Sequence, residues 1–401
     1  MARIIVLGAG FAGLWAAIGA ARTLDEIGQA AEILVIDRNP YHNIRVRNYE
    51  VELSEAAIPL GELLDPIGVA HRVAEVRAID PVKQQVTVAT SGGQEVLTYG
   101  RLVLALGSEL ARPAIPGLAA NGFDVDTYAA AVRLDAHLAT LGPQAPSEAR
   151  STVVVVGAGF TGIEVATEMP GKLDRAGVTG DRRIILVDPN PAVGVTIGDN
   201  ARPVINEALS AIGVETRLGV KVTAVEPNAI ALSSGEIIAT QTVVWCAGMR
   251  ASPLAETLDV ERDRYGRVIV DQFMRVTGAA NVFAAGDVAC SFVDGVHASV
   301  MSCQFARPMG RFAGYNVVAD LFGRPMLPLH IDWYVTVLDL GAWGALYTEG
   351  WDRQVRTSGA AAKLTKQTIN HVRIYPPRTG DRAEILAAGA PTLQAPPAVR
   401  S

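Results

Sequence analysis

The chain of 401 residues is long enough for two or three domains of roughly 100 to 200 residues each. Hydrophobic residues make up 49% of it and charged residues 19%, which is typical of an α/β enzyme with buried parallel strands and excludes a disordered or fibrous chain. The formal net charge of -6, without any basic block, argues against nucleic acid as a partner.

Cysteine and histidine usage argues against a metal centre. The three cysteines show no CxxC or CxxxxC spacing and the six histidines form no ligand-spaced cluster, so we expect neither a metal nor a redox-active disulfide. This cysteine usage favours a reducing compartment. With no charged leader, no apolar signal core and no run of about 18 apolar residues, the sequence predicts a cytoplasmic protein without a transmembrane segment.

A first glycine-rich turn follows the opening strand. IIVLGAGFAG at residues 4–13 reads as a strand entering GxGxxG, and a helical pattern leads on to ILVID, which ends at Asp37. In such a βαβ unit the first glycine makes the turn, the second admits a pyrophosphate and the third packs helix on strand. The acid accepts hydrogen bonds from ribose hydroxyls. We therefore predict a dinucleotide at Gly8, Gly10, Phe11, Ala12, Gly13, Asp37 and Arg38.

Two hairpin-rich meanders occupy corresponding places along the chain. Residues 82–107 return to a buried strand that ends at Gly107, and the proline- and glycine-rich segment 111–118 then reads as a linker. Residues 220–248 run through a similar meander to Gly248. We assign Val76, Ala105 and Gly107 to the first dinucleotide site and Gly248 to the second.

The second glycine-rich turn lies in VVVVGAGFTGIE at residues 153–164, about 150 residues after the first. Its second strand, IILVD, ends at Asp188, and Pro189 and Asn190 follow instead of an arginine. An acid there repels a 2′-phosphate, so we expect NADH in preference to NADPH. Arg182 and Arg183 begin the same strand and are expected at its far end, in solvent. The predicted site comprises Gly157, Gly159, Phe160, Thr161, Gly162 and Asp188.

One more strand returns to the first unit, in VFAAGDVA at residues 282–289. This phrase follows the pattern of the second FAD-binding motif, in which an aspartate at the tip of a strand caps the ribityl and phosphate region of the flavin. Gly286 and Asp287 would be the residues of that motif. The alternative interpretation is a simple Gly-Asp turn at the end of a strand. The second unit is then inserted into the first. We predict an α/β fold with an FAD-binding domain at 1–112 and 265–322 and an NADH-binding domain at 113–264.

The remaining residues, 323–401, are predicted to form a C-terminal cap domain. Residues 328–347 are aromatic and strand-like, and residues 358–372 follow a helical pattern. From Ala387 onward the alanine- and proline-rich tail is expected to be poorly ordered.

Two dinucleotides on one chain indicate electron transfer between them, because a flavin can take a hydride from NADH and pass electrons onward. With IDRNPYH at 36–42, LVLALGS at 102–108 and VVWCAGMRASPL at 243–254, the chain resembles the type II NADH dehydrogenases of the pyridine nucleotide-disulfide oxidoreductase superfamily, without their redox disulfide. The resemblance covers roughly residues 1–320. It implies a bound FAD, reduced by NADH and reoxidised by a quinone. It also implies that Glu164 lies near the nicotinamide and flavin, whereas an acid that favours the helix dipole is the plainer interpretation.

Departures from the family leave the electron acceptor open. SCQFARPMG at 302–310 keeps Gln304 but has Pro308 where the family has a second glutamine, and no C-terminal amphipathic helix is evident, which argues against membrane contact. Arg45 and Arg47, two residues apart, would point to one face of a strand and meet an anionic acceptor, the FAD phosphates or solvent. Cys303 is either near the flavin or a packed thiol.

His42 is assigned either to the FAD region or to packing, and Trp333, Tyr334 and Trp343 either to the core or to the acceptor site. Three functions follow. The first is an NADH dehydrogenase acting on a small-molecule, quinone-like acceptor. The second is a soluble NADH-dependent reductase or oxidase with another acceptor, and the third is a low-turnover redox sensor. A homodimer is one expected assembly.

Overall fold

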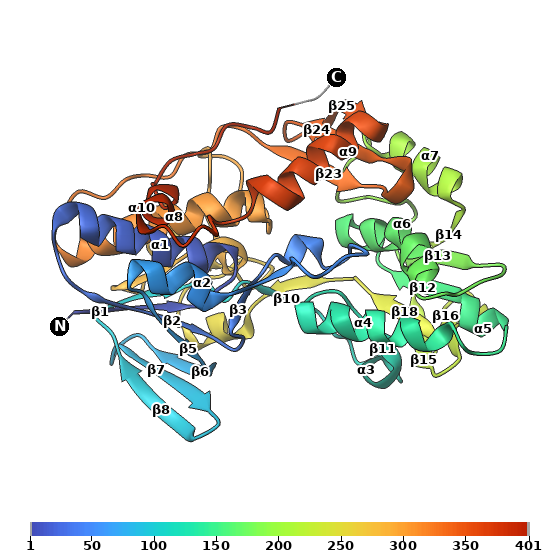
Figure 1. Cartoon of the computed structure of the whole chain (residues 1–401), viewed down its shortest axis with the longest axis horizontal. Helices are drawn as coiled ribbons and strands as arrows, with labels where there is room; N and C mark the ends of the chain where they lie inside the picture. Colours follow the sequence, from blue (N-terminus) through green and yellow to red (C-terminus); the bar gives the residue numbers. More distant parts are fainter. Residues whose placement is uncertain (1, 399–401) are drawn as a thin grey trace.

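Two parallel sheets of five strands dominate the computed structural model, which describes residues 2–398 (Figure 1). The first sheet has the order β21-β9-β1-β2-β5 and the second β11-β18-β12-β13-β14. Every pairing within them is parallel. The predicted α/β fold with two Rossmann-like sheets is therefore confirmed. Strands of the first sheet are β1 (Arg3–Leu7), β2 (Glu32–Asp37), β5 (Ala70–Val73), β9 (Arg101–Leu104) and β21 (Val282–Ala284).

Helices cover one face of the first sheet and a small antiparallel sheet, β6-β7-β8, lies beyond the other (Figure 1). The helices are α1 (Phe11–Ile27), α2 (Leu60–Leu64), α8 (Cys303–Leu321) and α10 (Arg382–Ala388). The meander strands are β6 (Glu75–Asp80), β7 (Gln85–Thr90) and β8 (Gly93–Thr98), of which β7 and β8 lie in the meander predicted at residues 82–107. A hairpin of β3 (Tyr41–Asn43) and β4 (Ala57–Pro59) follows β2.

The second sheet explains the run of four valines at its centre. In β12, Val153 and Val155 belong to one hydrophobic core, whereas Val154 and Val156 belong to another on the opposite face. A parallel strand buried on both faces needs apolar side chains at every position. The sheet comprises β11 (Gly122–Phe123), β12 (Thr152–Val156), β13 (Arg183–Asp188), β14 (Val214–Leu218) and β18 (Thr242–Trp245).

Around this sheet lie helices and a second meander. The helices are α3 (Leu118–Asn121), α4 (Tyr128–Leu141), α5 (Glu148–Ser151), α6 (Phe160–Arg175) and α7 (Arg202–Ile212). The meander consists of β15 (Val222–Glu226), β16 (Ala229–Leu232) and β17 (Ile237–Ala239), which pair antiparallel.

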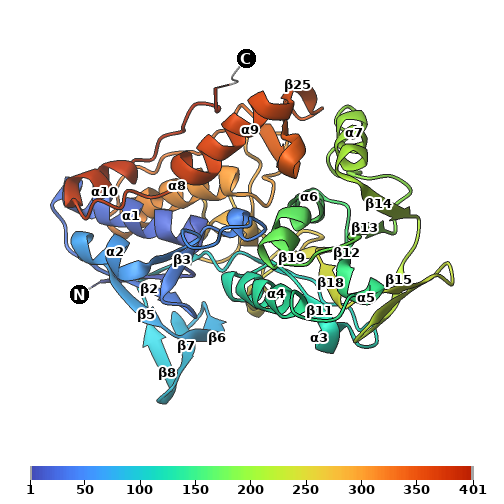
Figure 2. The ribbon, with the colours of Figure 1, turned by 45° about the vertical axis from the view of Figure 1, so that its right-hand side comes forward.

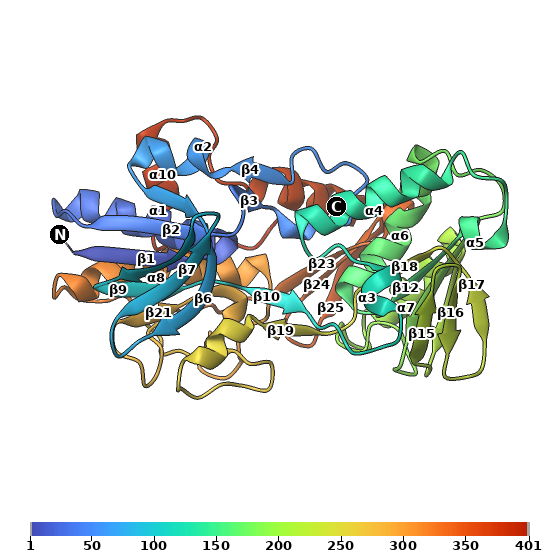
Figure 3. The same cartoon turned by 90° about the horizontal axis from the view of Figure 1, so that it is seen from below.

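The chain crosses between the sheets twice, through two strands that pair with each other. β10 (Ser108–Leu110) leaves the first sheet after β9, and β19 (Met249–Ala251) returns antiparallel to it (Figure 3). After β20 (Val268–Ile269), the strand β21 joins the first sheet beside β9. The second sheet is thus inserted into the first, as expected. β22 (Ala289–Cys290) pairs with β20.

The C-terminal part lies across both sheets and their helices (Figure 2). It contains the antiparallel strands β23 (Val335–Asp339), β24 (Ala345–Glu349) and β25 (Gln354–Ser358), then α9 (Gly359–Thr368) and a π-helical turn at Ile369–Arg373. The described part of the tail packs onto the protein: Tyr347 donates to the carbonyl of Pro397 at 3.2 Å, and Thr365 to that of Ala398 at 3.4 Å. The expectation of a poorly ordered tail stays a prediction, and residues 399–401 lie outside the described part.

Helices α1 and α8 pack closely because glycines face the backbone of the partner helix. A Cβ on Gly314 would lie 2.2 Å from the carbonyl oxygen of Ala16, and one on Gly310 would lie 2.3 Å from that of Ala12. No rotamer change can relieve contact with backbone atoms. The close approach of α8 to α1 therefore depends on these glycines.

We expect Gly314→Ala to destabilise the protein, since α8 must move away from α1. The expected loss is about 2 kcal/mol, which lowers the midpoint of thermal unfolding of this 401-residue chain by roughly 2 °C. Gly92→Ala serves as the control, because its Cβ would meet only the Thr90 hydroxyl, at 3.7 Å. Equal midpoints for Gly314→Ala and the wild type, measured by calorimetry, would contradict this account.

Candidate functional site

A large cavity lies between the two sheets and the C-terminal part. Its volume is about 1920 Å³, well above the roughly 300–1000 Å³ of an ordinary small-molecule pocket. Nearly all residues predicted for the two dinucleotide sites line it. The lining members are Gly8, Gly10, Phe11, Ala12, Asp37, Arg38, Val76, Ala105, Gly107, Gly157, Gly159, Phe160, Thr161, Glu164, Asp188, Gly248, Gly286, Asp287 and Gln304.

The first glycine turn places the N-terminus of α1 at this cavity. Gly8 has a φ of +96°, and a Cβ on Gly13 would lie 1.8 Å from the carbonyl oxygen of Gly8. Gly13 is one of two predicted residues that do not line the cavity, which agrees with its role in packing helix on strand. A Cβ on Gly10 would meet no atom within 4 Å, and Gly10 caps α1 without a side-chain hydrogen bond. The free N–H groups and open backbone there fit the pyrophosphate of a dinucleotide.

The second glycine turn repeats this geometry in the other sheet. Gly157 has a φ of +109°, a Cβ on Gly162 would lie 1.7 Å from its carbonyl oxygen, and Gly162 packs away from the cavity. Gly159 caps α6, again without a side-chain hydrogen bond, and a Cβ there would touch only the Thr196 hydroxyl, at 3.9 Å. The free N–H groups and open backbone at the start of α6 therefore fit the pyrophosphate of a second dinucleotide.

The acids at the strand ends also hold the turns themselves. Asp37 accepts hydrogen bonds from the N–H of Ala9 at 2.7 Å and of Asn39 at 2.8 Å. Asp188 accepts from the N–H of Ala158 at 2.6 Å and from Asn190. Each carboxylate therefore fixes the middle residue of its glycine turn, a contact that the sequence analysis missed.

The two arginines at the start of β13 lie at the end opposite Asp188. Arg182 pairs with Asp174, and Arg183 pairs with Glu215 and Glu148, each at 2.8 Å. The expectation that they lie away from the second site is confirmed, but both are engaged in surface ion pairs.

Asp287 lies where the first sheet meets the crossing strands. Its carboxylate accepts a hydrogen bond from the Ser108 hydroxyl at 2.7 Å and lies 3.7 Å from the Arg45 guanidinium. Arg45 also contacts Asp126, which lies between β11 and α4 of the second unit. The aspartate thus faces the cavity from a fixed position on the first sheet.

Arg45 and Arg47 do not lie on a strand. They form a 3₁₀ turn, Arg45–Arg47, in which Arg47 is only 2% exposed and binds Glu50 at 2.7 Å and the Tyr375 hydroxyl. The expectation that the two arginines point to one face of a strand is therefore wrong, and neither is a solvated surface residue. Asp126 positions the Arg45 side chain, and the nearby Glu50 together with the remote Tyr375 positions that of Arg47.

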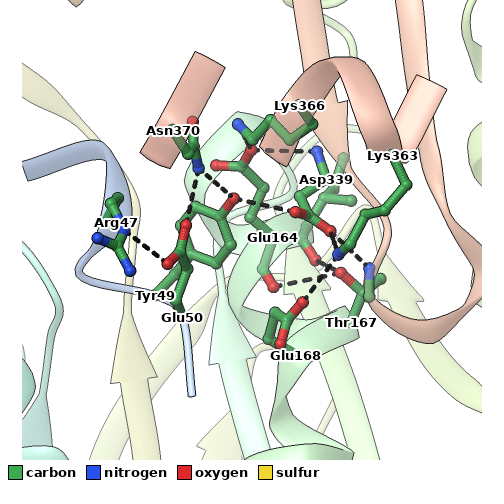
Figure 4. Close-up of polar contacts among 12 residues, drawn as sticks. Arg47, Tyr49, Glu50, Glu164, Thr167, Glu168, Asp339, Lys363, Lys366 and Asn370 are labelled. Atoms are coloured by element: carbon green, nitrogen blue, oxygen red, sulfur yellow. Dashed lines mark hydrogen bonds and ion pairs between the residues drawn. The ribbon is translucent and has the colours of Figure 1, made fainter. Parts of the chain in front are cut away.

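Glu164, at the start of α6, forms a buried ion pair with Lys366 of α9 (Figure 4). Glu164 is 8% exposed, the distance from its Oε1 to Lys366 Nζ is 2.7 Å, and the N–H of Asp339 donates to the same oxygen at 3.1 Å. Burial raises the pKa of Glu164, while Lys366 opposes the shift. Burial lowers the pKa of Lys366, but the Glu164 and Asp339 carboxylates outweigh it and raise the value. A proton can therefore be held between two groups at the cavity wall.

Further polar groups extend this ion pair to both sides (Figure 4). Asp339 accepts from the Tyr49 hydroxyl at 3.2 Å and binds Lys363, which also contacts Glu168 at 3.2 Å. The groups come from the N-terminal segment, from α6 and from the C-terminal part. The sequence analysis missed all of them except Glu164, because no local pattern marks them.

Gln304 and Cys303 lie on the first turn of α8, at the cavity. The Gln304 amide nitrogen is buried without a hydrogen-bond partner, so it can donate to a ligand. Burial raises the pKa of the Cys303 thiol, so the group is neutral and not a thiolate nucleophile. Of the aromatic residues considered, Trp333 and Tyr334 line the cavity, whereas Trp343 packs against the core of the second sheet.

Among residues 2–398, no His, Cys, Asp and Glu side chains gather into a group of three that could hold a metal ion. None of the helices in that range combines the length and the apolar character that a membrane span requires.

Residues 2–310 match the family model described as pyridine nucleotide-disulphide oxidoreductase. The chain belongs to this family. Members of the pyridine nucleotide-disulphide oxidoreductase family bind a flavin and a pyridine nucleotide, which agrees with two glycine turns at one cavity. The resemblance stated from the sequence is confirmed.

Relatives of this chain extend the match over its whole length. An NADH dehydrogenase-like protein of Mycobacterium tuberculosis is 57% identical over 403 residues, covering 99% of this chain and 100% of that protein. The demethylphylloquinone reductase of Synechocystis is 30% identical and covers 92% and 91%. The structure of NDH2 from Plasmodium falciparum, 13% identical, superposes with a TM-score of 0.75 over 97% of each chain and shares the fold.

His42 is a buried titratable residue beside the first glycine turn. Its Nδ1 lies 2.8 Å from the carbonyl oxygen of Ala9, its Nε2 has no partner, and its ring packs edge-on against Phe11. Burial lowers the pKa of His42 to about 4. The imidazole is therefore neutral in the folded protein at neutral pH.

We expect His42 to make the protein less stable as the pH falls from about 6.5 to about 4. Above this range the imidazole is neutral in both states, but within it only the unfolded chain takes up the proton. The free energy of unfolding should decrease by about 3 kcal/mol across the range. His42→Asn should remove this part of the slope in denaturant titrations, and His330→Asn, at an exposed site, should not. Identical slopes for wild type and His42→Asn would exclude the assignment.

Proposed function

We propose that the protein is an FAD-dependent NADH dehydrogenase that passes electrons from NADH to a quinone or quinone-like acceptor. The observation that carries the proposal is the opening of two glycine turns, one on each sheet, into one cavity. The names of the relatives support the same reaction. The balanced reaction consumes NADH, one proton and a quinone and yields NAD⁺ and a quinol.

FAD is assigned to the first turn and NADH to the second. Asp287 supports the first assignment, because it adds a carboxylate to the cavity from the 3₁₀ turn Gly286–Val288, which follows β21 of the same sheet. Residues Gly8, Gly10, Phe11, Ala12, Asp37 and Asp287 would hold FAD. Bound FAD supplies the capacity to take two electrons from NADH and release them to another acceptor.

The preference for NADH rests on Asp188. Its carboxylate is 7% exposed and lines the cavity beside Pro189 and Asn190, without an arginine in the same turn. A carboxylate accepts from ribose hydroxyls and repels the 2′-phosphate of NADPH.

We also propose that the protein is located in the cytoplasm, because its cysteine usage favours a reducing compartment.

In the proposed reaction the chain's own residues bind, orient and move a proton. Glu164 and Lys366 both line the cavity, and Lys366 Nζ lies 2.7 Å from Glu164 Oε1, so a proton can pass between these two atoms at the cavity wall. The amide nitrogen of Gln304 is free to donate to a quinone oxygen. Positioning the reactants in one enclosed cavity supplies most of the rate enhancement.

Anaerobic addition of NADH to the purified, FAD-loaded protein tests the function. We expect the flavin absorbance to bleach within seconds, with NADPH at least roughly tenfold slower because of the charge on Asp188. Added short-chain quinone should restore the colour. Failure to bleach would remove both enzymatic functions and leave a redox sensor. Reoxidation by oxygen or a dye but not by any quinone would favour a soluble reductase or oxidase.

We expect Glu164→Gln to reduce turnover with quinone by roughly 100-fold and to flatten its pH dependence, since the substitution removes a proton carrier but keeps the volume. Glu168→Gln is the matched control, because Glu168 lies one turn further along α6 and contacts Lys363. Steady-state kinetics across pH measures both variants. Unchanged rates and pH profile in Glu164→Gln would restrict Glu164 to a role in the helix terminus.

A further inference from the structure

Three arginines on one wall of the cavity have no acidic partner. Arg307 and Arg311 of α8 and Arg373 of the π-helical turn, here called the arginine wall, all line the cavity. Arg307 is 6% exposed and Arg311 is 5% exposed. Within residues 2–398, neither these two nor Arg373 lies within ion-pair distance of a carboxylate.

The other deeply buried cations among residues 2–398 are all compensated. Four have a carboxylate partner; these are Arg47 with Glu50, Lys172 with Asp135, Arg267 with Asp263 and Lys366 with Glu164. The fifth, Arg150, donates to the carbonyls of Leu141 and Gly142 at the negative end of the α4 dipole. Against this background Arg307 and Arg311 are exceptions.

Neutral groups of the C-terminal tail cover the arginine wall. Arg307 donates to the Gln394 side-chain oxygen at 3.1 Å, Arg311 to the carbonyl of Thr392 at 3.5 Å, and Arg373 to that of Ala395. The Nε atoms of Arg307 and Arg311 are buried without any partner. The two guanidinium groups lie 5.0 and 4.2 Å from the Trp15 ring centroid.

Such an arrangement is costly in the absence of negative charge. Burial lowers the pKa of Arg307 to about 10, with Arg311 as the next cause, and burial lowers the pKa of Arg311 to about 10. Buried cations ordinarily need a counter-charge, and an ionised acceptor forms a stronger hydrogen bond to a guanidinium than the amide oxygen of Gln394 does. An anion could therefore displace the tail oxygens from the arginine wall.

Two residues of the arginine wall lie on the same helix as Gln304, the residue proposed to donate to the electron acceptor. Arg307 and Arg311 follow Gln304 by three and seven residues on α8, so the three lie on one helix face. Along the helix axis they are about 4.5 and 10 Å beyond Gln304. The phosphates of a dinucleotide have their own position at the N-terminus of α1, where Gly10 opens to the cavity.

We propose that the arginine wall binds an anionic substituent of the electron acceptor, a carboxylate or an ionised hydroxyl carried by an aromatic quinone whose ring lies near Gln304. The inference rests on the proposed NADH:quinone function and narrows its substrate class. It differs from the anionic site considered for Arg45 and Arg47, both of which have acidic partners.

Two redox-inactive ligands of matched shape, 2-naphthoate and 2-naphthamide, test the charge preference on the wild-type FAD-loaded protein. Each is measured as an inhibitor of the reduction of neutral menadione by NADH. We expect naphthoate to inhibit at a concentration roughly 10- to 100-fold lower than naphthamide, the gain of charged over neutral hydrogen bonding. Equal inhibition constants would overturn the proposal without requiring any variant.

Arg307→Gln should reduce the naphthoate preference to less than about threefold, and Arg307→Lys, which keeps the charge, should retain part of it. Arg356→Gln is the control, since Arg356 lies on β25 away from the cavity and pairs with Glu349. If Arg307→Gln weakened both inhibitors equally, the arginine would only hold the tail. If it released FAD, the wall would belong to the flavin site. Either result would refute the proposal.

Anaerobic bleaching by NADH separates this inference from the function beneath it. A wild-type protein that is not bleached contradicts the NADH dehydrogenase function itself. A protein that is bleached and reduces menadione, but does not distinguish naphthoate from naphthamide, retains the function and loses only the anionic acceptor.

Discussion

The structure depends on two glycines, Gly13 and Gly162, which have no side chain where helix and strand meet. At each, a Cβ would lie less than 2 Å from the carbonyl oxygen of the glycine that begins the turn. The helix can therefore start directly above the strand end and present its N-terminal N–H groups to the cavity. Any side chain would push the helix away, and the site for a pyrophosphate would be lost.

The rest of the site follows from where these two helices begin. α6 carries Glu164 on its first turns, and α9 brings Lys366 to it, 202 residues later in the chain. α8 lies along α1 because Gly310 and Gly314 face its backbone, and it brings Gln304, Arg307 and Arg311 to the same cavity. The cavity thus combines a compensated ion pair that can carry a proton with arginines that, within residues 2–398, have no carboxylate partner.

Much of the fold could be predicted because its signals are local. Each βαβ unit is contained in about 35 residues, and the alternation in the meanders specifies hairpins. Two arginines at a spacing of two, in contrast, fit a strand or a 3₁₀ turn equally well, and only Glu50, Tyr375 and Asp126 decide between them. The position of the tail involves remote contacts as well, with Tyr347 and Thr365. Lys366 and Asp339 could not be predicted, since sequence separations of 202 and 175 residues hide their contact with Glu164.

The ion pair between Glu164 and Lys366 also has a mechanical consequence. It joins the inserted domain to the C-terminal part, which itself lies on the first sheet and its helices (Figure 2). A motion that swung the domains apart would separate these two side chains and expose both charges to solvent. The pair thus holds the helix that begins at the second glycine turn in a set position relative to the C-terminal part, and favours a closed cavity in which donor and acceptor keep a constant separation.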